Sequence, residues 1–167
     1  GTDPRDEATR RRLVELYRAS GDGPRALGAQ QELAALRPRD HDTLALLGRL
    51  LVEQDRGPEA IAAYERAIEI APDRLETALA LAQLHEWGNN PRRALALLER
   101  VAKARPADRA LQERVAALAQ GGEDGQAALS ALDRLAALSP QDSRYAQQAV
   151  DALVAANRLP EAIARQR

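Results

Sequence analysis

The sequence predicts an all-α fold of stacked antiparallel helix pairs, and three observations support this prediction. Hydrophobic residues make up 45% of the 167 residues but aromatic residues only 2%, with no Phe, Met or Cys. A core of Ala, Leu, Val and Ile requires helices that pack closely. The other two observations are prolines and alanines that each recur every 34 residues, which indicates a repeated supersecondary unit. The prolines are Pro38, Pro72, Pro106 and Pro140, and the alanines are Ala26, Ala60, Ala94, Ala128 and Ala162.

The period divides the chain into five predicted units. Residues 1–6 are interpreted as a leader, a cloning remnant or the end of a preceding helix. The units that follow are 7–40, 41–74, 75–108, 109–142 and an incomplete 143–167. The last unit lacks the recurring proline, and we expect its open packing face to allow end-to-end self-association.

Each unit is predicted to contain a first helix, a turn and a second helix. The first helix of the second unit shows Leu44, Leu47 and Leu51 at helical spacing. A proline in or near the first turn of the second helix fits there, because its missing N–H group has no intrahelical partner to lose. These prolines are Pro24, Pro58, Pro91 and Pro160.

Turn and cap residues set the predicted helix boundaries. We expect the turn glycines to supply the left-handed residue that ends each first helix. They are Gly23, Gly57, Gly88 and the pair Gly121–Gly122. The recurring proline ends the second helix. Aspartates two residues after it are expected to cap the next first helix, and these are Asp40, Asp108 and Asp142.

The recurring alanine marks the predicted closest crossing between two helices. Small residues in the first helix are expected to face it, namely Val14, Gly48, Ala82, Ala116 and Val150. Glycine costs a helix interior about 1 kcal/mol relative to alanine. We therefore expect a close approach of another helix at Gly48.

These features resemble the tetratricopeptide repeat (TPR) family. The second unit matches most completely, with Leu47, Gly48, Ala60, Tyr64, Ala67 and Pro72, and the first unit contributes Leu13, Tyr17, Ala26 and Pro38. The early Trp of the family is absent from every unit. The resemblance implies a right-handed α-solenoid of about four and a half repeats, acting as a non-catalytic scaffold for protein partners.

The resemblance also implies an inner surface built mainly from the first helices. Its residues are mixed in charge, which suits a folded protein or a polar peptide better than an apolar helix. The candidate partner-binding residues are Arg11, Glu15, Arg18, Arg49, Glu53, Gln83, Glu86, Trp87, Glu113, Gln120, Arg144 and Asp151. The alternative is that each of these charges is simply a solvated helix face.

A finer resemblance concerns the segment EWGNNPRRAL, which is similar to the TPR arrays of bacterial exopolysaccharide export proteins. The PelB type is the first choice and the BcsC type the second. This implies a periplasmic scaffold in biofilm polymer export that docks a PelA-like deacetylase and hydrolase and guides polymer towards the outer membrane. Two alternatives remain, a cytoplasmic TPR adaptor for a signalling or assembly partner and a surface that guides polysaccharide directly.

Composition excludes several other classes. The net charge of −1 gives no basic surface for nucleic acid, and no apolar run approaches the ~18 residues of a membrane span. The absence of Cys excludes disulfides and thiolate metal sites. The sequence has no phosphate-binding loop and no activated nucleophile. We therefore expect no enzyme activity, no cofactor and no membrane contact from this segment.

Three aromatic or imidazole residues require separate interpretation. His85 is expected to be a packed helix residue, because Tyr or Leu occupies its repeat position elsewhere. Asp40, His41 and Asp42 superficially resemble a metal cluster, but three consecutive residues at a helix start point in different directions, so we expect no metal. Trp87 is either an anchor for a partner or sugar ring, or a residue that packs over the turn on Leu84.

Overall fold

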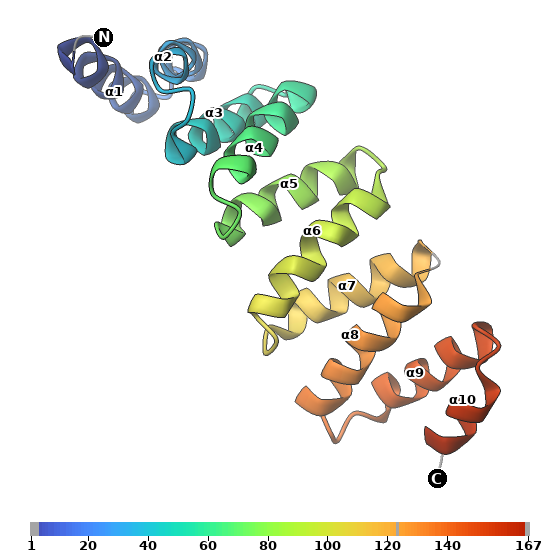
Figure 1. The fold of residues 1–167 in the computed structure, drawn as a ribbon. Coiled ribbons are helices and arrows are strands. Elements are labelled where there is room, and N and C mark those ends of the chain that lie inside the picture. Colours follow the sequence, from blue (N-terminus) through green and yellow to red (C-terminus); the bar gives the residue numbers. More distant parts are fainter. Residues whose placement is uncertain (1–3, 123, 166–167) are drawn as a thin grey trace. The chain divides into compact units, whose positions relative to one another are not determined.

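The computed structural model describes residues 4–122 and 124–165, and these form ten α-helices and no β-strand (Figure 1). The predicted all-α class of paired helices is therefore confirmed. The helices are α1 (Pro4–Ala19), α2 (Gly23–Leu36), α3 (His41–Glu53), α4 (Gly57–Ile70), α5 (Leu75–Trp87), α6 (Pro91–Ala104), α7 (Arg109–Gly121), α8 (Gly125–Leu138), α9 (Ser143–Ala155) and α10 (Leu159–Arg165).

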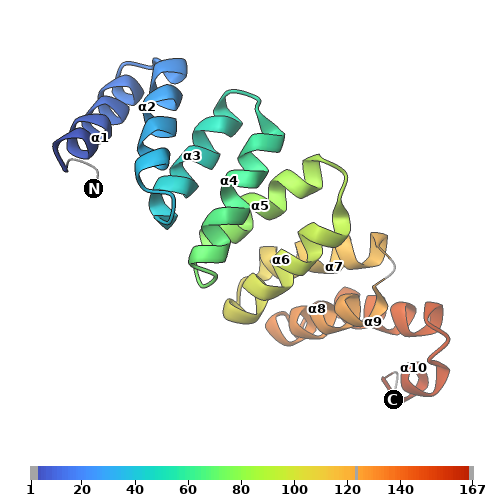
Figure 2. The ribbon, with the colours of Figure 1, turned by 45° about the horizontal axis from the view of Figure 1, so that its top comes forward.

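The helices group into two compact units, Gly1–Leu84 and His85–Arg167. In the first unit α1 contacts α2, α2 contacts α3, and α3 contacts α4. In the second unit the same succession joins α6 to α7, α7 to α8, α8 to α9 and α9 to α10 (Figure 2). In these pairs, helices that follow one another in the sequence therefore also pack against one another.

The first helices start at a constant interval. His41, Leu75, Arg109 and Ser143 open α3, α5, α7 and α9, each 34 residues after the last. The helix α1 begins earlier, at Pro4, so that residues 4–6 are helical. The division of the chain into repeat units as domains stays a prediction.

The recurring small residues lie in the core. All five alanines of the 34-residue period are buried, and so are Val14, Gly48, Ala82, Ala116 and Val150. At Gly48 a Cβ atom would lie only 2.8 Å from the ring of Tyr64. The close approach expected at Gly48 is therefore present, and it is made by the Tyr64 ring of the following helix.

Aspartate side chains cap the helices where the sequence predicts them. The carboxylates of Asp40, Asp108 and Asp142 accept hydrogen bonds from the backbone N–H groups of residues 43, 111 and 144. Asp22 and Asp124 cap the second helices α2 and α8 in the same way, and these two caps are additional to the predicted ones. Pro24, Pro58 and Pro91 lie in the first turns of α2, α4 and α6.

The recurring proline also acts as predicted at the ends of the second helices. The residue before it leaves the α region, with φ between −123° and −136° and ψ between 60° and 80°. These residues are Arg37, Ala71, Arg105 and Ser139. Each still donates its N–H to the carbonyl four residues earlier, so the last helical turn is satisfied before the chain turns.

The glycine prediction for the first helices is wrong. Among the described residues, positive φ occurs instead at Gly21, Asp55, Asn89 and Asn157, with φ from 53° to 74°. These positions share the 34-residue period, and the remaining equivalent, position 123, lies outside the described residues. Gly23, Gly57 and Gly125 open second helices instead, and Gly122 has φ −94°. The prediction failed because Asn and Asp also tolerate the left-handed region.

Two glycine-to-alanine substitutions should change stability in opposite directions. Gly28→Ala, inside α2 with open space around the new Cβ, should raise the free energy of unfolding by about 0.5–1 kcal/mol. Gly48→Ala should lower it, because overpacking against Tyr64 costs about 1–3 kcal/mol and exceeds the gain in helix propensity. Urea unfolding measures both. Equal stabilisation by the two substitutions would contradict the close approach at Gly48.

A larger side chain at the recurring alanine should also destabilise the fold. Ala94 in α6 is fully buried, so Ala94→Leu should cost roughly 1–3 kcal/mol through overpacking. Ala96 is exposed on the same helix and provides the control, since Ala96→Leu should stay within about 0.5 kcal/mol of the parent. An unchanged melting curve for Ala94→Leu would contradict the prediction, because it would mean that the helix crossing at Ala94 accommodates a larger side chain.

Candidate functional site

The candidate partner-binding residues lie at the surface in both units. In the first unit Arg11, Glu15, Arg18, Arg49, Glu53 and Gln83 are exposed. In the second unit Trp87, Glu113, Gln120, Arg144 and Asp151 are exposed, and Glu86 is half-buried. The first helices therefore present these side chains to solvent. Some of them line the same groove, as described next.

Two grooves in the first unit bring several of these side chains together. One, of about 310 Å³, is lined by Arg11, Glu15 and Arg18 of α1 together with Gln30 and Asp42 from α2 and α3. The other, of about 330 Å³, is lined by residues of α3, α4 and α5, with Arg49 and Glu76 among them. Each groove carries both signs of charge. Such a surface favours a polar partner with a matching pattern of charges.

The second unit contains a wider groove of about 630 Å³, lined by α7, α8 and α9. Its lining joins Gln120 and Asp151, two of the predicted residues, with Gln148. The rest of the lining is small, and comprises Ala119, Gly125, Ala128, Ala152, Ala155 and Ala156. Gln147 donates a hydrogen bond to Asp151 at 2.9 Å, which orients that carboxylate. Small residues with amide and carboxylate groups leave room for a peptide segment and supply hydrogen-bond partners for it.

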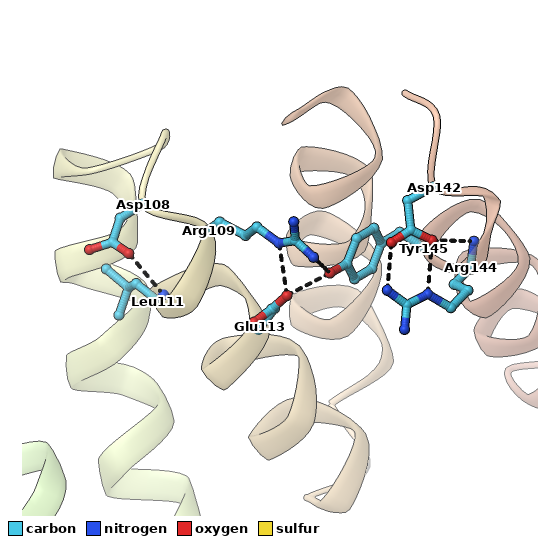
Figure 3. Close-up of polar contacts among 7 residues, drawn as sticks. All are labelled: Asp108, Arg109, Leu111, Glu113, Asp142, Arg144 and Tyr145. Carbon is cyan, nitrogen blue, oxygen red and sulfur yellow. Dashed lines mark hydrogen bonds and ion pairs between the residues drawn. The ribbon is translucent and has the colours of Figure 1, made fainter. Parts of the chain in front are cut away.

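A polar cluster around Tyr145 joins α7 to α9 (Figure 3). The buried Tyr145 donates its hydroxyl to Glu113 at 2.5 Å and accepts from Arg109 at 2.8 Å. Arg109 also donates to Glu113 at 3.0 Å. The guanidinium carbons of Arg109 and Arg144 lie 5.6 and 5.9 Å from the Tyr145 ring centre, close enough for cation–π attraction. Glu113 thus has partners within the chain before any ligand binds.

The same cluster lowers the pKa values of two carboxyl groups. The hydrogen bond from Tyr145, followed by that from Arg109, holds the pKa of Glu113 below its ordinary value. Arg144 donates two side-chain hydrogen bonds to Asp142 and lowers the pKa of that carboxyl to about 2. Both carboxylates therefore stay charged at neutral and mildly acidic pH.

Glu86, another predicted residue, is also engaged within the second unit. Arg114 of α7 donates from Nε to Glu86 Oε1 at 2.8 Å, and its Nη2 group bonds the other carboxylate oxygen. This bidentate geometry, with two parallel hydrogen bonds, is typical of a specific arginine–carboxylate pair. Glu86 therefore joins the end of α5 that lies in the second unit to α7, which qualifies its predicted role as a partner contact.

Trp87 remains the most exposed large apolar side chain of the described residues. Its side chain lies at the end of α5 and is 67% exposed. Packing over the turn, the alternative predicted for Trp87, therefore covers only the smaller part of its side-chain surface. A tryptophan that leaves most of its ring in water is available as an anchor for a partner.

The histidines have structural surroundings. His41 shares a hydrogen bond of 2.9 Å with Asp42 and another of 2.9 Å with Thr77, and Asp40 caps α3. His85 is buried in α5. In the part of the chain that the structure describes, no three His, Cys, Asp or Glu residues gather where they could hold a metal ion. None of the described helices has the length and apolar character needed to cross a membrane.

Sequence reasoning missed the contacts that run between neighbouring repeats. The pairs Arg109–Tyr145 and His41–Thr77 each join residues 36 apart in sequence. The repeat alignment could have indicated these pairs, because both link the first position of one repeat to the third position of the next. Nothing in the residue types alone shows which charged side chain reaches across.

Comparison with known proteins supports a tetratricopeptide repeat protein. Residues 51–121 match the tetratricopeptide repeat family. Among solved structures, one of MamA has 18% identity and a TM-score of 0.69 over 98% of this chain and 89% of that chain. MamA from Desulfovibrio magneticus RS-1 has 19% identity and a TM-score of 0.67 over 96% and 90%. At these identities the likeness concerns the fold. No curated protein sequence matches the chain.

Removing the hydroxyl of Tyr145 should raise the pKa of Glu113. Tyr145→Phe deletes the first cause of the lowered value. A carboxyl with a lowered folded-state pKa stabilises the protein above its unfolded pKa, and this stability is lost as the pH falls through the folded value. In Tyr145→Phe the stability linked to the ionised Glu113 should therefore be smaller, and its loss on acidification should be complete at a higher pH. Carboxyl-carbon NMR titration measures the shift, with Asp142 as the internal control, and an unmoved Glu113 pKa would contradict the assignment.

Proposed function

We propose that this tetratricopeptide repeat chain is a non-catalytic scaffold that binds other proteins through the surfaces of its first helices. TPR repeats support a role in protein–protein interaction, and half of the predicted residues, namely Arg11, Glu15, Arg18, Arg49, Gln120 and Asp151, line grooves within the two units. The proposed partner is a folded protein or polar peptide, because the two grooves of the first unit carry both signs of charge.

The exposure of Trp87 carries this proposal. Protein interfaces concentrate their binding energy in a few Trp, Tyr and Arg residues, which lie near the centre of the contact. Trp87 is 67% exposed and stands beside Glu86 on a first helix. Burial of the indole by a partner would remove a large apolar surface from water while the surrounding charges give orientation.

A finer proposal places this scaffold in exopolysaccharide export. What supports it is the resemblance of EWGNNPRRAL to the TPR arrays of Pel-type export proteins. In that case the chain is periplasmic, and its partner is a PelA-like deacetylase and hydrolase that modifies the polymer. A cytoplasmic TPR adaptor for a signalling or assembly partner is the alternative within the same class.

A second candidate function is direct contact with the polymer. The exposed ring of Trp87 favours it, because a flat aromatic face at the surface can pack against the apolar face of a sugar ring. The two candidates differ in what buries Trp87, which is either a protein surface or a glycan chain.

Binding experiments with the purified chain test these proposals. As the single Trp of the sequence, Trp87 reports its own burial by fluorescence. A periplasmic deacetylase of the Pel type should shift the emission to shorter wavelength, and Trp87→Ala should weaken its binding at least ~10-fold. Leu138→Ala provides the matched control, because Leu138 is an exposed apolar residue on the second helix α8, and this substitution should leave the affinity unchanged.

The same assay separates the alternatives. A shift with soluble amino-sugar polymer in the absence of protein would support the polymer-guiding surface. Binding to the deacetylase that is equal for the parent, Trp87→Ala and Leu138→Ala would refute Trp87 as the anchor. No binding to the deacetylase, with capture of a cytoplasmic partner that Trp87→Ala abolishes, would retain the scaffold and reject the export role.

A further inference from the structure

One position of the second helix differs in polarity between the two compact units. It is held by Gln30 and Tyr64 in the first unit and by Leu98 and Leu132 in the second. All four residues are more than nine-tenths buried, with exposures of 0%, 6%, 0% and 0%. The two leucines show that an apolar side chain fills this position, so packing alone does not account for the polar groups in the first unit.

Gln30 has a buried oxygen atom without a hydrogen-bond partner. Its Nε2 group donates to the carbonyl of Thr43 at 2.7 Å. This bond fixes the orientation of the amide, because its oxygen atom would repel that carbonyl. The oxygen, Oε1, receives no hydrogen bond from the described residues, and a buried acceptor in this state costs free energy. Gln30 therefore keeps an unused acceptor in the lining of the groove of about 310 Å³.

Tyr64 brings a hydroxyl group to the other groove of the first unit, of about 330 Å³. In the part of the chain that the structure describes, this hydroxyl makes no hydrogen bond. The hydroxyl of Tyr145, by contrast, bonds both Arg109 and Glu113. Burial raises the pKa of Tyr64, so its hydroxyl stays protonated at neutral pH and can donate as well as accept a hydrogen bond.

The two grooves adjoin along α3. Asp42 and Leu46 of this helix line both of them, and all of the lining residues belong to the first unit. One extended segment that crosses α3 can therefore reach Gln30 in one groove and Tyr64 in the other. An extended polypeptide offers an N–H donor and a C=O acceptor at each residue other than proline, which matches an unused acceptor and an unused donor.

The charges of the linings indicate which side chains such a segment carries. Each acidic residue of the two linings has a partner within the chain, and these residues are Glu15, Asp40, Asp42 and Glu76. Arg11 is bonded to Glu7. Arg18 and Arg49, one in each lining, take part in no hydrogen bond or ion pair with the described residues. The groups left for a ligand are thus two guanidinium groups, which favour carboxylates on the segment.

We propose that these two grooves together bind an extended acidic segment of a partner protein, and that Gln30 and Tyr64 form hydrogen bonds to its backbone. A backbone N–H of the segment donates to Gln30 Oε1, and a backbone carbonyl accepts from the Tyr64 hydroxyl. Carboxylates of the segment pair with Arg18 and Arg49. This inference rests on the proposed scaffold function and names the class of partner for the first unit, whereas Trp87 lies in the second.

Selection of a random peptide library displayed on phage against the purified chain tests the inference. The selected peptides should be rich in Asp and Glu. In affinity measurements with these peptides, Gln30→Leu and Tyr64→Phe should each weaken binding at least ~5-fold, because each removes one buried hydrogen bond. Both variants should stay folded, since leucine fills the position of Gln30 in the second unit and phenylalanine keeps the ring that covers Gly48.

Tyr17→Phe is the matched control, because it also removes a tyrosine hydroxyl from the first unit. Tyr17 lines neither groove, so this variant should bind the peptides like the parent. Urea unfolding should show that all three variants are folded under the conditions of the binding assay.

Peptides with a single N-methylated backbone nitrogen identify the hydrogen bond to Gln30. Methylation at one position should weaken binding to the parent at least ~5-fold. The same methylated peptide should bind Gln30→Leu as well as the unmethylated peptide does. Such a loss of coupling distinguishes a direct hydrogen bond from a change in the shape of the groove.

Several results would overturn the inference. They are the selection of no peptide, equal peptide binding by the parent, Gln30→Leu and Tyr64→Phe, or an N-methylation effect that persists in Gln30→Leu. Binding of a soluble polyuronate that Gln30→Leu weakens, without selection of peptides, would replace the peptide by a polysaccharide. Peptides that lose affinity in Trp87→Ala alone would retain the scaffold function and reject the site in the first unit. So would a fluorescence response of Trp87 to a protein partner when no peptide is selected.

Discussion

The fold depends on close approach between helices at positions that hold no large side chain. The five alanines of the 34-residue period and the small residues of the first helices are all buried. At Gly48 even a methyl group would meet the Tyr64 ring. In a core without Phe or Met, dispersion contacts must come from many small and branched side chains, which makes the distance between helices the decisive variable.

The turns recur with the same backbone features in successive helix pairs. Aspartate caps begin the helices, and a residue in the left-handed conformation ends most of the first helices. After Asp55, for example, the N–H of Arg56 donates to the carbonyl of Leu51, which satisfies the last helical turn as in a Schellman motif. The pairs α3–α4, α5–α6 and α7–α8 accordingly have the same lengths, 13 and 14 residues, so that the small residues recur at the same places along them.

Most of the long polar side chains of the first helices lie outside the core, and they are the ones that can contact a partner. Some of these side chains form hydrogen bonds between neighbouring repeats. Glu86 accepts from Arg114, and Glu113 accepts from Tyr145. Others, such as Arg18, Arg49 and Trp87, lie exposed on the first helices. One set of residues thus joins repeats together while the adjacent set remains available for a partner, and the scaffold proposal rests on the second set.

The sequence by itself determined the helix class, the 34-residue period, the starts of the later first helices and the aspartate caps, because these depend on local backbone chemistry and on spacing along the chain. It did not determine the left-handed position, since Asn and Asp share with Gly the ability to adopt it. Only the tertiary structure decided that Tyr64 covers Gly48, that Tyr145 joins Arg109 to Glu113, and that Trp87 faces water. Those outcomes depend on side-chain directions across two or three helices, which a linear pattern of residue types does not encode.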